Sequence, residues 1–172
     1  MNKQALTQFW DHFRQVYGMS LRVIEGLPAD KLDSHPIPNM RTPKELVIHS
    51  HGFIKSIGEG VIKGEIQAEP DEKKTAASIK SRDELLKYAR DCWKTADQAV
   101  ARVTDQQLQA TVKTPWDVEF PGHVCFTIAQ DEFLHHRGQM FTYLRALGGE
   151  PPMMWDFENN AAEYRPKAQA KA

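Results

Sequence analysis

Hydrophobic residues recur along most of this chain at alternating intervals of four and three residues, which is the pattern of helices that bury one face. The first such stretch runs from about Lys3 to Leu27. Because proline cannot continue a helix, Pro28 and Pro36 mark the end of that element. The positions expected on its inward face are Phe9, Phe13, Val16, Ser20, Val23 and Leu27.

A second helix is predicted to begin at Pro43, because Thr42 and Glu45 have the spacing of a capping box around it. One histidine, His49, lies inside its apolar stripe. The pattern stops before a charged segment, residues 65–80. The positions expected to share the inward face are Leu46, His49, Phe53, Ile57 and Val61.

A third helix is predicted to follow the capping box that Ser81 and Glu84 form. Several of its inward positions are small, which would allow a neighbouring helix to approach closely: Leu85, Ala89, Cys92, Ala96, Ala99 and Val103. Residues 104–122 then lack helical periodicity. A short stretch within them, residues 111–116, is too isolated to predict a sheet, since a lone hairpin is marginally stable in water. We therefore expect a loop there.

The fourth helix is expected from near His123 to Leu147, because the glycine pair at 148–149 is typical of a helix end. Its expected inward positions are Cys125, Ile128, Glu132, His136 or His135, Gln139, Tyr143 and Leu147. Four long helices and almost no strand predict an all-α fold. The apolar residues of the following segment, Met153, Met154, Trp155 and Phe157, could pack back on the helices.

Composition and charge narrow the class of protein. The 172 residues, 41% of them hydrophobic, can bury one substantial core, so a single domain is expected over residues 1–157 and a partly disordered C-terminal tail over residues 158–172. Lys and Arg total 22 against 23 Asp and Glu, with no basic block, which argues against a nucleic-acid partner. No stretch approaches the roughly 18 apolar residues of a membrane span, and no signal segment is visible, so we expect a cytoplasmic protein without membrane association. Cys92 and Cys125 form no CxxC motif and are expected to be core thiols.

The centre of the fourth helix carries the candidate chemistry. Glu132 and His136 are four residues apart, so their side chains share one helix face and can reach one cation. An unpaired buried carboxylate is costly, and these polar groups on a core stripe therefore need partners. Bundles commonly house metal sites with ligands from facing helices, and His49 is the obvious third donor. The sequence predicts a metal site formed by His49, Glu132 and His136.

These histidines also have explanations that need no metal. A single histidine on an apolar face, such as His49, is commonly a satisfied core or partly exposed residue. His135 points about 100° around the helix from His136 and can either bond Asp131 or face the site from its edge. His51 lies two residues from His49, points away from it, and is expected at the surface or an interface.

Gln139 and Tyr143 fit two readings equally, as core residues bonded to the backbone or as donors that face a substrate. Together with His135 they are the candidates for catalytic residues. Gly138 inside a helix costs about 1 kcal/mol relative to alanine. Close approach of another helix or of a substrate would offset this cost, and we expect helix packing to be the reason.

Several motifs on the last helix resemble a known family. The run His136-Arg137-Gly138-Gln139, the sequence Tyr-Leu-Arg-Ala-Leu-Gly at 143–148 and the proline pair at 151–152 are similar to the terminal helix of the DinB/YfiT-like proteins. A weaker similarity at residues 45–49 and the order of the helices extend the resemblance to residues 1 to about 157. It implies a four-helix bundle with a long crossover connection, usually a homodimer, and a divalent metal held by a histidine of the second helix and an HxxxH pair of the last.

His49 and His136 match two of the ligands that the resemblance implies, whereas Glu132 stands where the family has the first histidine of the pair. The replacement is chemically sound, because two histidines and a glutamate are a known catalytic zinc set and the same donors suit Fe(II). Zinc or nickel is the expected metal, with Fe(II) as a further candidate. Three protein ligands leave coordination positions open, as in catalytic sites.

Two functions from different classes follow. The first is a metal-dependent enzyme acting on a small molecule, either a hydrolase or, as the resemblance favours, a low-molecular-weight thiol transferase. The second is a non-catalytic, dimeric, stress-related binding protein in which the same residues form a buried polar network. For the enzyme, we expect a cleft over the site, bordered by residues 65–80 and by the segment around Trp155.

Overall fold

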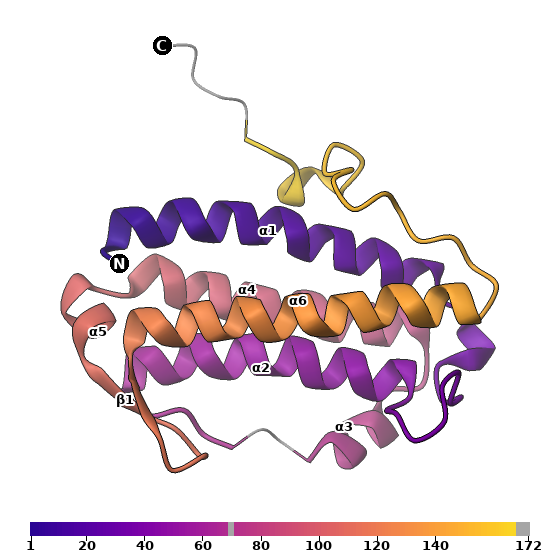
Figure 1. Ribbon diagram of the computed structural model, residues 1–172, viewed down its shortest axis with the longest axis horizontal. Helices are drawn as coiled ribbons and strands as arrows, with labels where there is room; N and C mark the ends of the chain where they lie inside the picture. The colour runs from indigo at the N-terminus through magenta and orange to yellow at the C-terminus, as the bar shows by residue number, and fades with distance from the viewer. Residues whose placement is uncertain (69–70, 168–172) are drawn as a thin grey trace.

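The computed structural model describes residues 1–68 and 71–167, and four long helices dominate this part of the chain. They are α1 (Lys3–Gly26), α2 (Pro43–Lys63), α4 (Arg82–Arg102) and α6 (Gly122–Ala146), and they lie alongside one another as a bundle (Figure 1). The helices α2 and α4 run in the same direction, so the chain between them must return along the bundle (Figure 1). The all-α fold with a long crossover is thereby confirmed.

The predicted helix starts follow from local capping. The Thr42 side chain accepts a hydrogen bond from the Glu45 amide at 3.2 Å, and the Glu45 carboxylate accepts one from the Thr42 amide at 2.9 Å. Both interactions satisfy amides that have no partner within the helix. Ser81 caps α4 by accepting from the Glu84 amide. At the other end of α2, Gly64 adopts a φ of 78°, which ends the helix.

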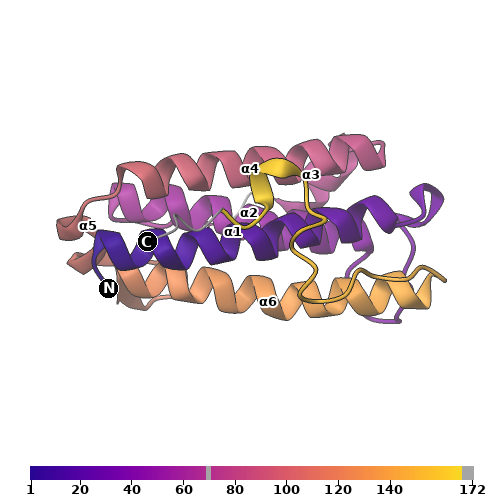
Figure 2. The ribbon, with the colours of Figure 1, turned by 90° about the horizontal axis from the view of Figure 1, so that it is seen from above.

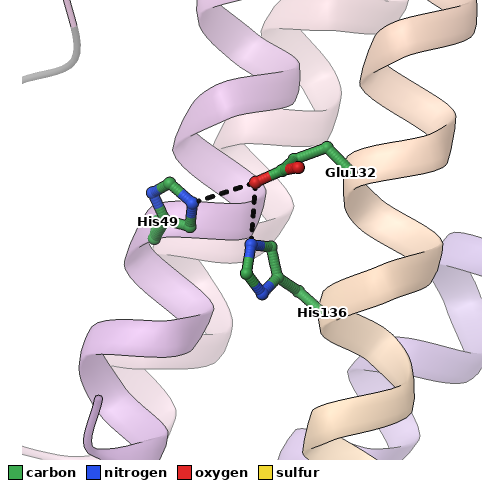
Figure 3. Close-up of side chains that lie close together, drawn as sticks. All are labelled: His49, Glu132 and His136. Carbon is green, nitrogen blue, oxygen red and sulfur yellow. Dashed lines mark hydrogen bonds and ion pairs between the residues drawn. The ribbon is translucent and has the colours of Figure 1, made fainter. Parts of the chain in front are cut away.

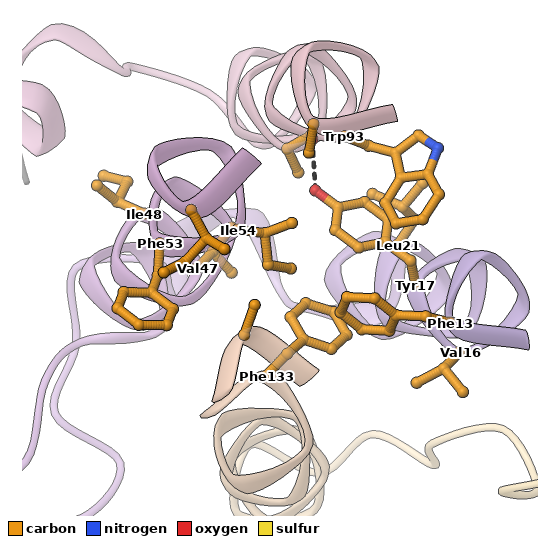
Figure 4. Close-up of a cluster of buried hydrophobic side chains, with 14 of the residues drawn as sticks. Phe13, Val16, Tyr17, Leu21, Val47, Ile48, Phe53, Ile54, Trp93 and Phe133 are labelled. Carbon is orange, nitrogen blue, oxygen red and sulfur yellow. Dashed lines mark hydrogen bonds between the residues drawn. The ribbon is translucent and has the colours of Figure 1, made fainter. Parts of the chain in front are cut away.

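The centre of the bundle is filled with aromatic side chains from α1, α4 and α6. The Tyr17 ring stacks on Phe133 with centroids 5.1 Å apart, and it also contacts Trp93 at 4.6 Å. Phe13 meets Phe133 edge to face (Figure 4). The buried Tyr17 hydroxyl donates to the Ala89 carbonyl at 2.6 Å, so the polar end of this ring is satisfied.

Small residues bring α2 and α4 close together, as predicted. A Cβ atom added at Gly58 would lie 3.0 Å from the Ala96 Cα atom, so only glycine fits there without movement. The related expectation for Gly138 was wrong. A Cβ at that position would have no neighbour within 4 Å, and helix packing within the described chain does not account for this glycine.

The segment at 104–122 is not the loop that the sequence predicted. It contains α5 (Asp105–Gln109) and an antiparallel hairpin of β1 (Thr111–Lys113) and β2 (Glu119–Pro121). The hairpin is not isolated, because the Ile66 amide donates to the Lys113 carbonyl at 2.8 Å and the Lys113 amide donates to Gly64 at 3.1 Å. Val112 is fully buried as well. Pairing and burial stabilise strands that would be marginal alone.

The crossover between α2 and α4 also contains a short helix, α3 (Glu72–Ser78), beside the first turns of α2 (Figure 1). At the C-terminus the chain turns back over α1 and forms the 3-10 helix η2 (Ala162–Tyr164) (Figure 2). Tyr164 and Asn160 are buried there, so part of the expected tail has defined packing. Residues 168–172, which were included in that tail, lie outside the described residues.

The apolar segment after α6 packs less than expected. Met153 and Trp155 are 64% and 62% exposed, and only Phe157 of the four apolar residues packs against the core. Cys92 and Cys125 are free and buried, as predicted, and burial raises the pKa of each thiol to about 11. No helix in the described ranges is both long and apolar enough to cross a bilayer.

Candidate metal site

The three predicted ligands come together where α2 and α6 face each other. His49 projects from α2, while Glu132 and His136 project from successive turns of α6 (Figure 3). One oxygen of Glu132, Oε1, lies 3.2 Å from His49 Nε2 and 2.8 Å from His136 Nε2. In residues 1–68 and 71–167, this is the one group of three or more His, Cys, Asp or Glu side chains with the geometry to hold an ion.

The cluster lies at the rim of the bundle and not in its core. The side chains of His49, Glu132 and His136 are 16%, 36% and 7% exposed. Some predicted inward positions of α6 are buried, namely Cys125, His136 and Tyr143, but Ala129, Phe133 and Met140 are buried in place of Ile128, Glu132 and Gln139. The buried face is shifted by one residue at these positions, because Phe133 packs in the aromatic core. Glu132 is therefore reached by solvent.

Glu72 is a functional candidate that the sequence did not reveal. Its Oε1 atom lies 3.0 Å from Nδ1 of His49, the ring nitrogen that faces away from Glu132. The Arg41 guanidinium forms two hydrogen bonds with the same carboxylate, at 2.9 and 3.0 Å. Only the arrangement of α3 beside α2 brings Glu72 to His49. In the sequence it is one acidic residue of a charged segment, and no spacing marks it.

His136 is oriented in a similar way by Gln139. Its Nδ1 lies 2.8 Å from the Gln139 Oε1, and the Gln139 amide nitrogen lies 3.0 Å from His135 Nε2. His135 therefore reaches the site through Gln139 and through its own ring contact with His136, with centroids 4.9 Å apart. With the amide assigned from these hydrogen bonds, Nδ1 of His136 carries a proton and donates to Gln139, and Nε2 is the ring nitrogen that faces Glu132.

The same reasoning applies to His49, whose Nδ1 donates to the Glu72 carboxylate. When both rings are neutral, two Nε2 lone pairs and a carboxylate oxygen therefore converge on one point. Such an arrangement requires a positive charge at its centre, either as protons on the rings or as a cation. Glu72 and Gln139 thus orient both imidazoles for binding a positive charge.

Glu132 is held as a carboxylate. Burial raises its pKa, but hydrogen bonds and charge from His136 and His49 outweigh burial and lower the pKa overall. The pKa of Glu72 is lowered for related reasons, since burial is outweighed there by Arg41 and His49. Both groups are ionised at neutral pH, which is the form that binds a cation.

The ligand atoms are close enough together to surround one metal ion. Nitrogen and oxygen ligands bonded to tetrahedral zinc at about 2.0–2.2 Å lie roughly 3.3–3.6 Å from one another. The separations of 3.2 and 2.8 Å from Glu132 to the two histidines are hydrogen-bond distances slightly shorter than this, and the three ligand atoms all lie within 4.8 Å of one another, so small side-chain movements would place them around an ion. The partners on the second ring nitrogens are those that metal-bound histidines usually have. The donor set therefore fits a divalent ion.

Tyr143 lies farther from the cluster. It is fully buried, and its hydroxyl donates to the Arg41 carbonyl at 2.7 Å. It lines a cavity of about 350 Å³ together with His135, His136 and Gln139. The three candidate catalytic residues thus share one cavity with one ligand of the cluster.

His51 was expected at the surface or an interface, and that prediction was wrong. Its side chain is 1% exposed and packs edge to face against both the Tyr17 and Phe133 rings, with centroids 4.9 and 5.2 Å away. Burial lowers its pKa to about 3, although a bond from Nδ1 to the Val47 carbonyl opposes this shift. Helix α2 is buried on a wider face than one stripe, because α4 and α6 pack against it and α3 lies beside its first turns.

Comparison with known proteins agrees with this fold. A solved structure of a DinB-like protein, YjoA, from Bacillus subtilis is similar with a TM-score of 0.70, covers 86% of this chain and 96% of its own, and is 18% identical. No curated protein matches the chain. A family model described as the DinB family matches residues 1–167. Since that match spans nearly the whole chain, the protein belongs to the DinB family.

Proposed function

We propose that this protein is a metal-dependent enzyme that binds one divalent ion through His49, Glu132 and His136. The observation that carries the proposal is the convergence of two imidazole nitrogens on one ionised carboxylate oxygen. The exposed side of Glu132 leaves room for a further ligand, as in catalytic sites. Zinc or nickel suits these donors best, and Fe(II) also accepts two histidines and a carboxylate.

The reaction that we propose is transfer or hydrolysis at a small molecule, with a low-molecular-weight thiol as the favoured co-substrate. A bound divalent ion would supply Lewis acidity and would favour the deprotonated form of water or a thiol. The chain itself contributes orientation. Glu72 and Gln139 fix the ring planes of His49 and His136. His135 lines the cavity of about 350 Å³ that His136 also lines, and it is the candidate for accepting a proton from the substrate.

Metal content tests this proposal. Protein purified without a nickel column and saturated with zinc or nickel should retain about one ion per chain after desalting. His49→Ala and His136→Ala should retain far less, because each loses one of three ligands. His35→Ala is the matched control, since this exposed ring bonds the Met40 carbonyl outside the cluster. A wild-type content far below stoichiometry would support the non-catalytic binding protein instead.

A further inference from the structure

A second cavity, of about 320 Å³, opens beside the metal-site residues on the side of α3 and the hairpin. Its polar lining residues are His49, Ser56, Gln67 and Glu72. Its apolar wall is formed by Phe53, Ile66, Pro115 and Trp116. The cavity with His135 and Gln139 shares no residue with it. A volume near 300 Å³ is at the small end of the range for ligand pockets. The occupant is therefore a small molecule or one part of it.

The wall at the hairpin is held in place by the backbone. The strand β1 is hydrogen-bonded to residues 64–66, and the turn is closed by Thr114, whose hydroxyl donates to the Val118 carbonyl at 2.6 Å. Asp117 takes a positive φ of 57° in that turn. These contacts fix the backbone beside Trp116 relative to Ile66 and α2. The cavity is thus bordered by a defined turn.

Trp116 itself is 47% exposed, although it belongs to the residue type with the largest apolar surface. Its ring lies 5.7 Å from the Phe53 ring at an angle of 40°, so the two rings form an open angle without stacking. Phe53 and Ile66 behind it are 6% and 3% exposed. A flat apolar group placed against Trp116 would cover this surface, and covering it is favourable.

We propose that this cavity binds an apolar ring or a hydrocarbon group of similar size in the substrate. The ring lies against Trp116 and Phe53, and the reacting end points to His49. This inference rests on the proposed function for the reacting end, but the apolar subsite does not require the ion. It follows that Trp116 determines specificity among substrates that share one reacting group.

The test uses benzyl alcohol as a single-ring probe and xylose as a polar ring of similar size, each titrated into metal-free protein. Backbone amide NMR shifts report the position and the dissociation constant. We expect benzyl alcohol to shift Phe53, Ile66, Trp116 and His49, and xylose to leave them unchanged. Trp116→Ala should weaken benzyl alcohol binding about tenfold. Trp155→Ala is the matched control, because Trp155 is 62% exposed and does not line the cavity.

The proposal would be overturned by equal responses to the two probes, by shifts confined to other residues, or by unchanged binding in Trp116→Ala. The apolar subsite and the metal-dependent activity can fail separately. If the probe binds but the protein binds no metal, the metalloenzyme proposal is refuted and the subsite proposal stands. If the protein binds metal but not the probe, the subsite proposal is refuted and the metal site stands.

Discussion

Glu132 is the residue on which the chemistry of the site most depends, because one of its two carboxylate oxygens, Oε1, contacts both His49 and His136. The DinB resemblance implies histidine at this position, whereas this chain places an ionised carboxylate there. A carboxylate adds negative charge to the ligand set and favours harder ions more than imidazole does. The two substitutions that separate these roles are glutamine and histidine.

We predict that Glu132→Gln weakens zinc or nickel binding by at least about 100-fold, because an amide oxygen carries no charge and is a poor ligand. Glu132→His should retain the metal, since it supplies a third imidazole. Isothermal titration of the metal-free variants measures both affinities. Asp131→Asn is the matched control, because Asp131 is exposed and lies next to Glu132 in the sequence but outside the cluster. Unchanged affinity in Glu132→Gln would show that Glu132 is not a ligand.

Glu72 should act through His49 and not by direct bonding. We predict that Glu72→Gln weakens metal binding by about 10- to 100-fold, the usual cost of losing a partner of a metal-bound histidine. The loss should be smaller than in Glu132→Gln. Glu65→Gln, at an exposed position of the same crossover, should have no effect. The same titration decides this, and a loss equal to that of Glu132→Gln would make Glu72 a ligand.

Among the helices and strands, the features that depend on nearby residues were predicted from the sequence, whereas those that depend on residues far apart in the chain were missed. The N-terminal ends of α2 and α4 follow from capping residues within four positions of each other, and both starts were predicted to within about a residue. The hairpin was missed because its stability comes from pairing with residues 64–66, which no local pattern indicates. Glu72 was missed for the same reason. The pair Glu132 and His136 was found because one helix fixes their spacing.

Helix α6 contains a glycine that destabilises the helix, and no close packing among the described residues offsets this loss of stability. Gly138 is exposed, and a Cβ there would meet nothing within 4 Å. We predict that Gly138→Ala raises the free energy of unfolding by about 0.5–1 kcal/mol, because alanine loses less backbone entropy on folding. Urea unfolding followed by circular dichroism measures the change. A destabilised variant would show that this face of α6 contacts another molecule, such as a second copy of the chain.

At the scale of the whole molecule, the two cysteines report on global unfolding. Cys92 and Cys125 are 2% and 1% exposed, and burial raises the pKa of both thiols to about 11. Because the thiolate is the reactive form, we predict that neither reacts appreciably with Ellman's reagent at pH 8 in the folded protein. Both should react in denaturant. Rapid labelling of the folded protein would mean that the helices around them open readily.

The bundle as a whole positions the site by packing α2 against α6 and by returning the crossover along its side, so that α3 brings Glu72 to His49. The most direct test is an anomalous difference map from crystals of the zinc-loaded protein. One peak should lie between His49, Glu132 and His136, within about 2.0–2.2 Å of two imidazole nitrogens and one carboxylate oxygen. A peak elsewhere, or no peak at these residues in zinc-saturated crystals, would contradict the metal site.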